Sequence, residues 1–342
     1  MMGAYQAPWY LKDGLWQTTA TSYWYGTAWS WWGDRVPWLA GYPLIPWQEH
    51  VFEGADGVPL WGQWASPPKA RGTLIINYGI TGQTTTAWYA QTLARKAYAR
   101  SWAVCLYDWR GHGQTGERSP APSSDGWREG EDQVRMAEQL VALGCPERVS
   151  LAGFSLGGQL ALWGLKAAVE LGTPFIQSAA VLAPNLESNR SLAYLRTTPG
   201  GRAIEWMLVQ EIRREAQKRR ERFPEAVKPG AVERITSISS YDHEMVIDYY
   251  GFLSVADYYQ KTSGLYLLDT LALPYLLIYA EDDPMFDPAL LPEIRERTAR
   301  NPQAQLLMTQ GGGHVGHITQ AAGKEDEFWG LNRMLDFLGN LI

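Results

Sequence analysis

The chain has few cysteines and no long apolar run. Only Cys105 and Cys145 occur among 342 residues, without metal-ligand spacing, so we expect buried free thiols rather than a disulfide or a metal site. No stretch of 18 apolar residues is present, and the start Met-Met-Gly-Ala-Tyr-Gln lacks a basic segment followed by an apolar one. We therefore expect neither a spanning helix nor a cleaved signal peptide.

An excess of positive charge is also lacking. The chain has 36 Asp and Glu and 30 Lys and Arg, which gives a net charge of −6. This charge argues against nucleic acid as a partner. With the reduced thiols, this balance predicts a cytoplasmic protein and leaves contact with a membrane surface open. A hydrophobic content of 46% allows a large core over this length.

Apolar strands alternate with helical patterns along most of the chain, which predicts a mostly parallel sheet of about eight strands with helices on both faces. The first two strands flank the turn Ala55-Asp-Gly57 and favour an antiparallel pair. Strands are predicted at 50–53, 60–65, 73–78, 102–107, 148–152, 178–183, 275–280 and 304–309, and helices at 84–99, 128–143, 156–170, 289–300 and 325–341.

The pentapeptide Gly153-Phe-Ser155-Leu-Gly157 joins a predicted strand to a predicted helix. A serine hydroxyl is a weak nucleophile at neutral pH, and it needs a sharp strand-to-helix turn that presents Oγ to a base. The helix that follows supplies unpaired N–H groups and a positive dipole end. This context predicts that Ser155 is the nucleophile of an α/β-hydrolase fold.

Partners for this serine follow in the order that the fold requires, acid and then histidine. Asp282 and Asp283 come after the strand 275–280, and we favour Asp283 as the acid because of its distance from Pro288. His314 follows three glycines after the strand 304–309 and is predicted to be the base, with His317 as the alternative. His112 precedes the serine and is interpreted, with its loop, as structural.

A backbone oxyanion hole is predicted from two further positions. The loop after the strand 73–78 donates one N–H in such hydrolases, and the residue after the nucleophile donates the other. Ile80 and Leu156 occupy these positions. No metal and no organic cofactor is expected.

Four blocks of sequence resemble a known family, the YheT-like α/β-hydrolases, from about residue 14 onward. This group contains esterases and lipases whose animal members act on acylglycerols and phospholipids. The resemblance implies the triad Ser155, Asp283 and His314, and it departs at Tyr78, where histidine is usual. The blocks are Gly14-Leu-Trp-Gln-Thr18, Gly79-Ile-Thr-Gly82, Asp108-Trp-Arg-Gly-His-Gly113, and the series Tyr241-Asp242, Gly251-Phe252, Asp257-Tyr258-Tyr259, Ser263, Pro274 and Asp282-Asp283-Pro284.

Three regions are predicted: an aromatic arm at 1–48, a hydrolase core at 49–184 and 273–342, and a helical lid insertion at 185–272. Within the lid, 202–222 is a charged helical pattern that favours an ordinary solvated helix over a membrane-binding one. Five lid aromatics could line an acyl pocket or pack in a core. They are Tyr249, Tyr250, Phe252, Tyr258 and Tyr259.

The arm holds eight of the 17 tryptophans and five tyrosines. The stretch with Trp24, Trp29, Trp31, Trp32 and Trp38 is interrupted by Gly and Pro, which argues against one long helix. Its rings either pack on the domain or on a second subunit, or they touch a membrane. The first interpretation is favoured, and peripheral membrane contact and homodimerisation stay open.

The predicted function is a serine carboxylic-ester hydrolase, related to esterases and lipases, that forms an acyl-enzyme on a small-molecule or lipid ester. Two alternatives share the sequence features: an acyltransferase with the same triad, and a non-catalytic binding protein on a hydrolase scaffold. The sequence does not separate hydrolysis from acyl transfer, because the triad is identical.

Overall fold

An eight-stranded sheet forms the centre of the molecule. The computed structural model describes residues 4–32, 41–320 and 325–341 and orders the strands β1-β2-β4-β3-β5-β6-β7-β8. The pairs β1–β2 and β2–β4 are antiparallel, and β3 to β8 pair in parallel. The strands are β1 (Gln48–Glu53), β2 (Pro59–Ala65), β3 (Thr73–Asn77), β4 (Ala103–Tyr107), β5 (Val149–Phe154), β6 (Ile176–Leu182), β7 (Tyr275–Ala280) and β8 (Ala304–Thr309).

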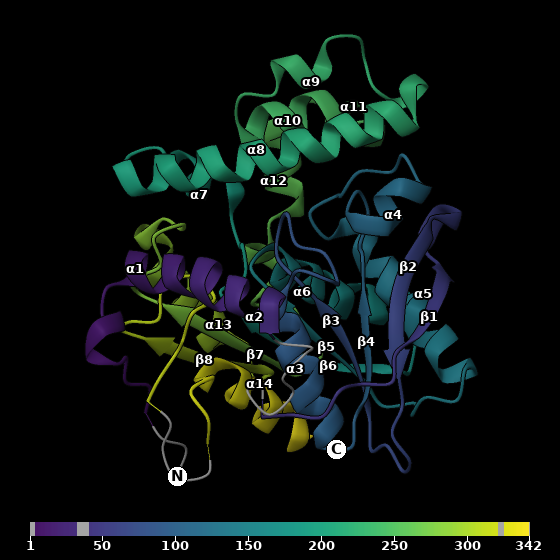
Figure 1. The fold of residues 1–342 in the computed structure, drawn as a ribbon, viewed down its shortest axis with the longest axis vertical. Coiled ribbons are helices and arrows are strands. Elements are labelled where there is room, and N and C mark those ends of the chain that lie inside the picture. The colour runs from purple at the N-terminus through teal and green to yellow at the C-terminus, as the bar shows by residue number, and fades with distance from the viewer. Residues whose placement is uncertain (1–3, 33–40, 321–324, 342) are drawn as a thin grey trace.

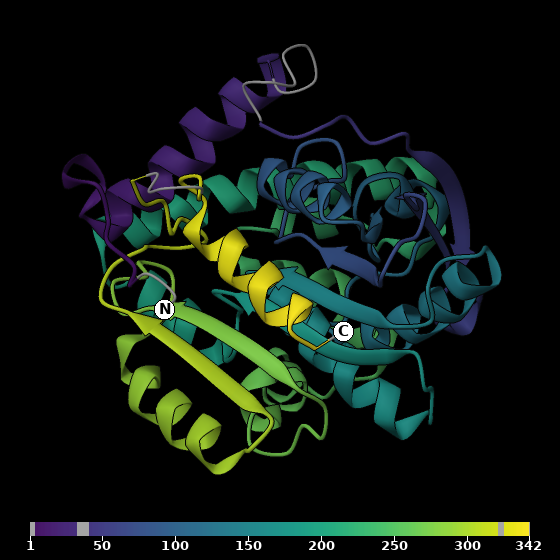
Figure 2. The same cartoon turned by 90° about the horizontal axis from the view of Figure 1, so that it is seen from below.

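Helices cover both faces of this sheet (Figures 1 and 2). α3 (Trp88–Ala99) and α14 (Trp329–Gly339) lie on one face, and α5 (Trp127–Ala142), α6 (Leu156–Glu170) and α13 (Leu291–Arg300) lie on the other. Because the sheet is covered twice, every residue of β3, β4, β5 and β7 is buried. The predicted α/β-hydrolase fold with a mostly parallel sheet is therefore confirmed. Cys105 and Cys145 are buried and free.

Two predicted helices begin four residues later in the structure. The helix after β3 begins at Trp88 rather than at 84. The Thr84 N–H donates to the Asp108 carboxylate (2.9 Å), and residues 84–86 form a turn before the helix. The last helix begins at Trp329 rather than at 325. The sequence did not reveal α4 (Gly113–Arg118), which is a short helix after β4.

A helical cap follows β6 and lies above the carboxyl ends of the strands (Figure 1). Its α7–α12 have their own apolar cluster, which includes Val209, Ile212, Val232 and Tyr258. In the charged helix α8, acidic residues of the same helix pair with basic ones, so its outer face is an ordinary solvated face. The cap helices are α7 (Ser188–Leu195), α8 (Pro199–Arg222), α9 (Ala231–Arg234), α10 (Ile238–Met245), α11 (Ile247–Tyr250) and α12 (Val255–Thr262).

The amino-terminal arm is more regular than the sequence predicted. α1 (Gly14–Thr19), a π-helical segment (Ala20–Tyr25) and α2 (Gly26–Trp32) follow one another without a break. Of the residues expected to interrupt this stretch, Gly33 and Pro37 lie outside the described residues; Gly26 does not end the helix and packs against the Trp88 ring. Trp38 lies outside the described residues. No helix in the described ranges combines the length and apolarity that a membrane span requires.

Candidate active site

Ser155 occupies a sharp turn between a strand and a helix. β5 ends at Phe154 and α6 begins at Leu156, and Ser155 between them has φ 53° and ψ −126°. A positive φ is strained for a residue with a side chain, and such strain concentrates at functional sites. The strain here aims the side chain out of the sheet and into the space below the cap, where Ser155 lines a pocket.

The two glycines around Ser155 are required by close backbone approach. A Cβ at Gly153 would lie 2.2 Å from the carbonyl oxygen of Gly157. A Cβ at Gly157 would lie 2.2 Å from the carbonyl oxygen of Tyr78, on the neighbouring strand end. Both distances are well inside van der Waals contact, so a side chain at either position would push the turn apart.

The structure brings Ser155, His314 and Asp283 into one hydrogen-bonded chain. His314 Nε2 lies 2.8 Å from Ser155 Oγ, and His314 Nδ1 lies 2.8 Å from Asp283 Oδ2. The second oxygen of Asp283 accepts the Met285 N–H at 2.9 Å, which fixes the carboxylate. The acid and the base are on the loops after β7 and β8, at the carboxyl edge of the sheet, where ligands of such sheets bind.

Asp282, the competing acid, has a different partner from Asp283. Its Oδ1 accepts the N–H of Gly313 at 2.9 Å and so braces the loop that carries His314. Burial raises the pKa of the Asp282 carboxyl. A Cβ at Gly14 would lie 2.1 Å from the Asp282 carbonyl oxygen, so the arm packs tightly on this acid.

The arm also braces the loop that carries His314, a contact that the sequence did not predict. The Thr18 hydroxyl accepts the His314 N–H at 2.7 Å, and Gln17 Oε1 accepts the Ile318 N–H at 2.9 Å. Both side chains are buried. The sequence feature that could have indicated this contact is the block Gly14–Thr18, which resembles the family but was given no role.

The other two candidate histidines are held in structural contacts. His317 is fully buried, with Nε2 2.9 Å from Thr309 Oγ1 and its ring stacked on Trp329, and burial lowers its pKa to about 3. His112 Nε2 accepts the Thr81 N–H at 3.3 Å, and burial lowers its pKa to about 4. Neither ring is hydrogen-bonded to Ser155.

Ile80 and Leu156, the predicted oxyanion donors, both line the pocket that contains Ser155. Leu156 opens α6, so its N–H has no acceptor within the helix. Among the described residues, none accepts a hydrogen bond from the N–H of Ile80 or of Leu156. A Cβ at Gly79 would lie 3.1 Å from the Ser155 Cβ, so this loop is in direct contact with the serine.

The loops around the oxyanion position are tied together by a buried carboxylate. Tyr78, which replaces the family's histidine, donates its hydroxyl to Asp108 at 2.9 Å. Asp108 also accepts the N–H groups of Thr84 and Gln114, and burial raises its pKa. Nearby, Arg110 binds Asp132 through two hydrogen bonds of 2.7 and 2.9 Å. These contacts agree with the structural interpretation of this loop.

Two cavities share Ser155 and Ile80 in their walls. The inner cavity, about 90 Å³, lies beneath the cap and has apolar walls that include Leu192, Leu208 and Phe286. The outer cavity, about 600 Å³, lies between the arm and α8 and also reaches His314. Of the five lid aromatics named above, only Tyr259 lines either cavity among the described residues.

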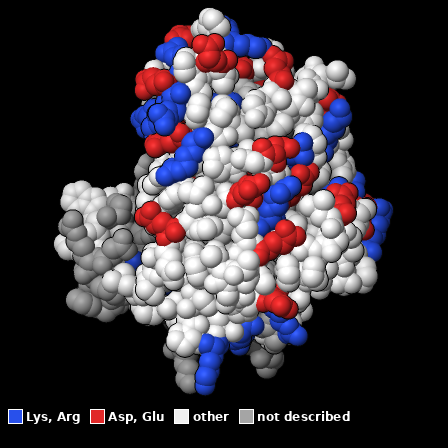
Figure 3. Space-filling view, turned by 90° about the vertical axis from the view of Figure 1, so that its right-hand side faces the viewer, with Lys and Arg blue, Asp and Glu red and all other residues white. Residues whose placement is uncertain are grey.

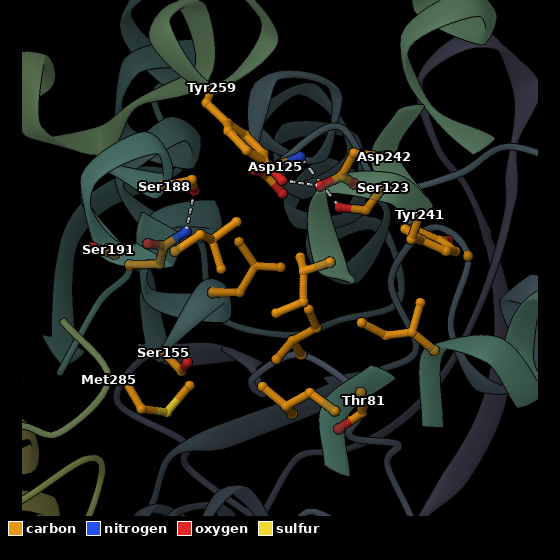
Figure 4. Close-up of a pocket in the computed structure, with 18 of the residues that line it drawn as sticks. Thr81, Ser123, Asp125, Ser155, Ser188, Ser191, Tyr241, Asp242, Tyr259 and Met285 are labelled. Atoms are coloured by element: carbon orange, nitrogen blue, oxygen red, sulfur yellow. Dashed lines mark hydrogen bonds between the residues drawn. The ribbon is translucent and has the colours of Figure 1, made fainter. Parts of the chain in front are cut away.

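A pair of acids closes the far end of the inner cavity. In Figure 4, Ser155 and Met285 lie on one side of the pocket, and Asp125, Asp242 and Tyr259 lie on the opposite side. Burial and the charge of Glu129 raise the pKa of Asp125 to about 7. Burial and the charge of Asp125 raise the pKa of Asp242 well above its usual range, and Tyr259 donates its hydroxyl to Asp242.

No group of three His, Cys, Asp or Glu side chains within the described part of the chain could hold a metal ion. The site consists of a strained serine, a base bonded to it, an acid on the base, and Ile80 and Leu156, whose N–H groups have no acceptor among the described residues. This set of parts is suited to acyl transfer through a covalent intermediate.

Comparison with known proteins places the chain among hydrolases. The family described as alpha/beta hydrolase fold matches residues 72–321. A Synechocystis sp. protein, slr0264, whose name provisionally makes it an esterase, is 39% identical over 97% of this chain and 93% of its own. Escherichia coli YheT, named in the same provisional way, is 25% identical over 85% of this chain and 84% of its own. Human phospholipase ABHD3 is 23% identical, over 87% and 74%.

Solved structures agree on the fold. A Pyrobaculum calidifontis esterase superposes with a TM-score of 0.52 at 18% identity, over 96% of this chain and 94% of its own. The Pyrococcus furiosus esterase Pf2001 gives 0.52 at 17% identity, over 82% and 85%. The family match and the similarity to slr0264 over nearly the full length agree with the geometry of the site. The chain therefore belongs to the α/β-hydrolase family, in its YheT-like group of esterase-like hydrolases.

Proposed function

We propose that this protein is a serine carboxylic-ester hydrolase. The observation that carries the proposal is the unbroken chain Asp283–His314–Ser155, with two contacts of 2.8 Å, at the wall of a cavity that can hold a substrate. A histidine in contact with both a hydroxyl and a buried carboxylate has the arrangement that activates serine nucleophiles.

In the proposed reaction, Ser155 Oγ attacks the ester carbonyl while His314 Nε2 takes the hydroxyl proton. The carbonyl oxygen gains negative charge and is stabilised by the N–H groups of Ile80 and Leu156. The C–O bond to the alcohol then breaks, and the alcohol leaves with the proton from His314. Water, deprotonated by His314, attacks the acyl-enzyme and releases the acid and free Ser155. Asp283 keeps Nδ1 protonated and stabilises the imidazolium.

The cavity walls favour an ester with a substantial apolar part. The inner cavity beneath the cap is lined mainly by aliphatic and aromatic side chains, among them Leu192, Leu208, Ile212 and Phe286. Apolar groups gain free energy in such a space because water is removed from both surfaces. Lipid esters fit this description, and relatives named as a phospholipase and as a monoacylglycerol lipase are consistent with it.

The test is hydrolysis of a chain-length series of p-nitrophenyl esters by wild type and by Ser155→Ala. We expect the variant to fold normally and to lose turnover by about 10⁵ to 10⁶-fold, the scale seen when a triad serine is removed. Ser150→Ala, on the same strand and bonded to Ser178, is the matched control and should keep near-normal turnover.

Full activity in Ser155→Ala would refute the proposal. If wild type forms a new ester when a small alcohol is added, at the expense of the free acid, the acyl-enzyme is used for acyl transfer. If wild type binds esters but turns none over, the protein is a binding module on this scaffold.

A further inference from the structure

The arm helix, residues 14–32, buries polar side chains and exposes aromatic ones. Its small and polar side chains are buried, among them Thr21 and the two that bond to the histidine loop, Gln17 and Thr18. The aromatic side chains are instead exposed: the rings of Trp16 and Trp24 contact each other edge to face, with 4.9 Å between their centroids, and Tyr23 and Trp31 are also open to solvent. A helix that contributed to the core would have the reverse arrangement, so packing among the described residues does not explain the exposed rings.

These rings are open to solvent. Trp24 is 60% exposed and Trp31 is 67% exposed, although tryptophan is usually covered in a folded protein. Trp206 of the facing cap helix α8 is 65% exposed. We call this set of exposed rings the aromatic rim; its members are Trp16, Tyr23, Trp24, Trp31, Trp32 and Trp206.

The rim borders the opening of the outer cavity. Tyr23 from the arm and Trp206 from α8 both line this cavity, whose inner end reaches Ser155 and His314. The two helices are in contact here, since the Tyr23 hydroxyl is bonded to Met207 Sδ. In Figure 1 the arm helix lies directly below α8, on the same side of the molecule. An apolar surface that touched the rim would therefore meet the mouth of the site.

The charges near the rim do not form a field of one sign. On α8, Arg214 pairs with Glu211 and Lys218 pairs with Glu215. Figure 3, which shows the right-hand side of the molecule in Figure 1 rather than the side where α1 lies, also shows acidic and basic side chains interspersed over the cap. The chain as a whole carries a net charge of −6. Attraction to an anionic surface is thus weak, and contact would depend on the rings.

We propose that the aromatic rim docks on an uncharged lipid surface and opens the outer cavity to lipid esters in that surface. Tryptophan and tyrosine suit this contact because they combine a large apolar ring with a polar edge, and such rings settle at the boundary of lipid and water. A second copy of the chain on the rim would cover the mouth of the cavity, whereas a lipid surface would supply the substrate. The substrate part of this inference rests on the proposed ester hydrolysis; the docking part does not.

The test is flotation of the whole protein with vesicles of phosphatidylcholine, at ~0.1 M and ~1 M NaCl, between which the screening length falls from about 10 Å to about 3 Å. We expect wild type to float at both salt concentrations. The triple variant Trp24→Gln, Trp31→Gln, Trp32→Gln should float about 10-fold less, since three apolar contacts are lost.

The matched control is the triple variant Leu143→Gln, Val169→Gln, Leu171→Gln. These side chains are also exposed, but they lie at the carboxyl ends of α5 and α6, at the opposite edge of the sheet. The control should float like wild type. Both triple variants should hydrolyse a soluble short-chain ester at the wild-type rate, because none of the six side chains lines either cavity.

Docking is overturned if wild type does not float, if the rim variant floats like wild type, or if the control loses flotation equally. It is also overturned if wild type is a dimer in light scattering and the rim variant is a monomer. Failure of the proposed function looks different: the protein would float, and Ser155→Ala would float like wild type, but no ester would be hydrolysed.

Discussion

Asp125 and Asp242 at the far end of the inner cavity and Asp283 behind the catalytic serine are buried carboxyl groups in opposite settings. At the catalytic end, Asp283 lies 2.8 Å from an imidazole nitrogen and accepts a backbone N–H. At the far end, Asp125 and Asp242 face each other's charge, and the pKa of each is raised by burial and by a neighbouring acid. A carboxylate orients a base only where donors surround it; beside another acid, it is driven toward its neutral form.

The largest effect of removing one of these carboxylates is expected at the catalytic end. Asp283→Asn keeps the size of the side chain but removes the charge that orients His314 and stabilises its imidazolium. We expect turnover of a soluble ester to fall by about 10³ to 10⁴-fold, with little change in KM, as for other triad acids. Steady-state kinetics near neutral pH measure this loss, and circular dichroism checks that the fold is kept.

Asp282→Asn is the control for this loss. An asparagine oxygen can still accept the Gly313 N–H, so the brace on the histidine loop is kept. Turnover should remain within about 10-fold of wild type, because only the geometry of a supporting contact changes. If Asp282→Asn were the inactive variant and Asp283→Asn the active one, the role of the triad acid would belong to Asp282.

The far end is tested through stability rather than turnover. The folded protein holds the proton of Asp125 up to a pKa of about 7, against 3.8 for the free side chain. It therefore binds more protons than the unfolded chain between these values, and stability from this group is full at low pH and is lost as pH rises toward 7. Asp242→Asn removes one of the two interacting charges and can still accept from Tyr259.

We therefore expect Asp242→Asn to raise the melting temperature above that of wild type at pH 8, with a smaller difference at pH 4. Thermal melts across this range measure the difference between variant and wild type. Glu138→Gln, an exposed acid on α5, should show no such trend. An equal shift at both pH values would mean that the substitution acts through packing rather than through charge.

Much of the fold was predictable because its signals are local. Strands such as 275–280 are continuous apolar runs, and a sheet covered on both faces requires such runs. The order of serine, acid and histidine was predictable from the fold's chain order, and the structure brings Ser155, Asp283 and His314 together. The choice between Asp282 and Asp283 depends on which loop atoms each reaches, and adjacent positions hardly differ in sequence.

The arm could not be predicted for a tertiary reason. Gly and Pro in the stretch from Trp24 to Trp38 argued against one long helix, but the helix continues through Gly26, where the arm approaches the Trp88 ring. Contacts with the core thus override the local preference. The sequence left open whether the aromatic rings of the arm face the core or the solvent. The buried side chains Gln17 and Thr18 decided it, through bonds to residues about 300 positions away.

The central claim is that Ser155 is the nucleophile, and covalent labelling tests this claim most directly. A fluorophosphonate transfers its phosphorus to an activated serine Oγ, with loss of fluoride. The account predicts one adduct by mass spectrometry, on Ser155 within the peptide 149–166, and no adduct on Ser155→Ala or on wild type pretreated with a competing ester. An adduct on Ser150 or on a serine outside this peptide, or undiminished labelling of Ser155→Ala, would contradict it.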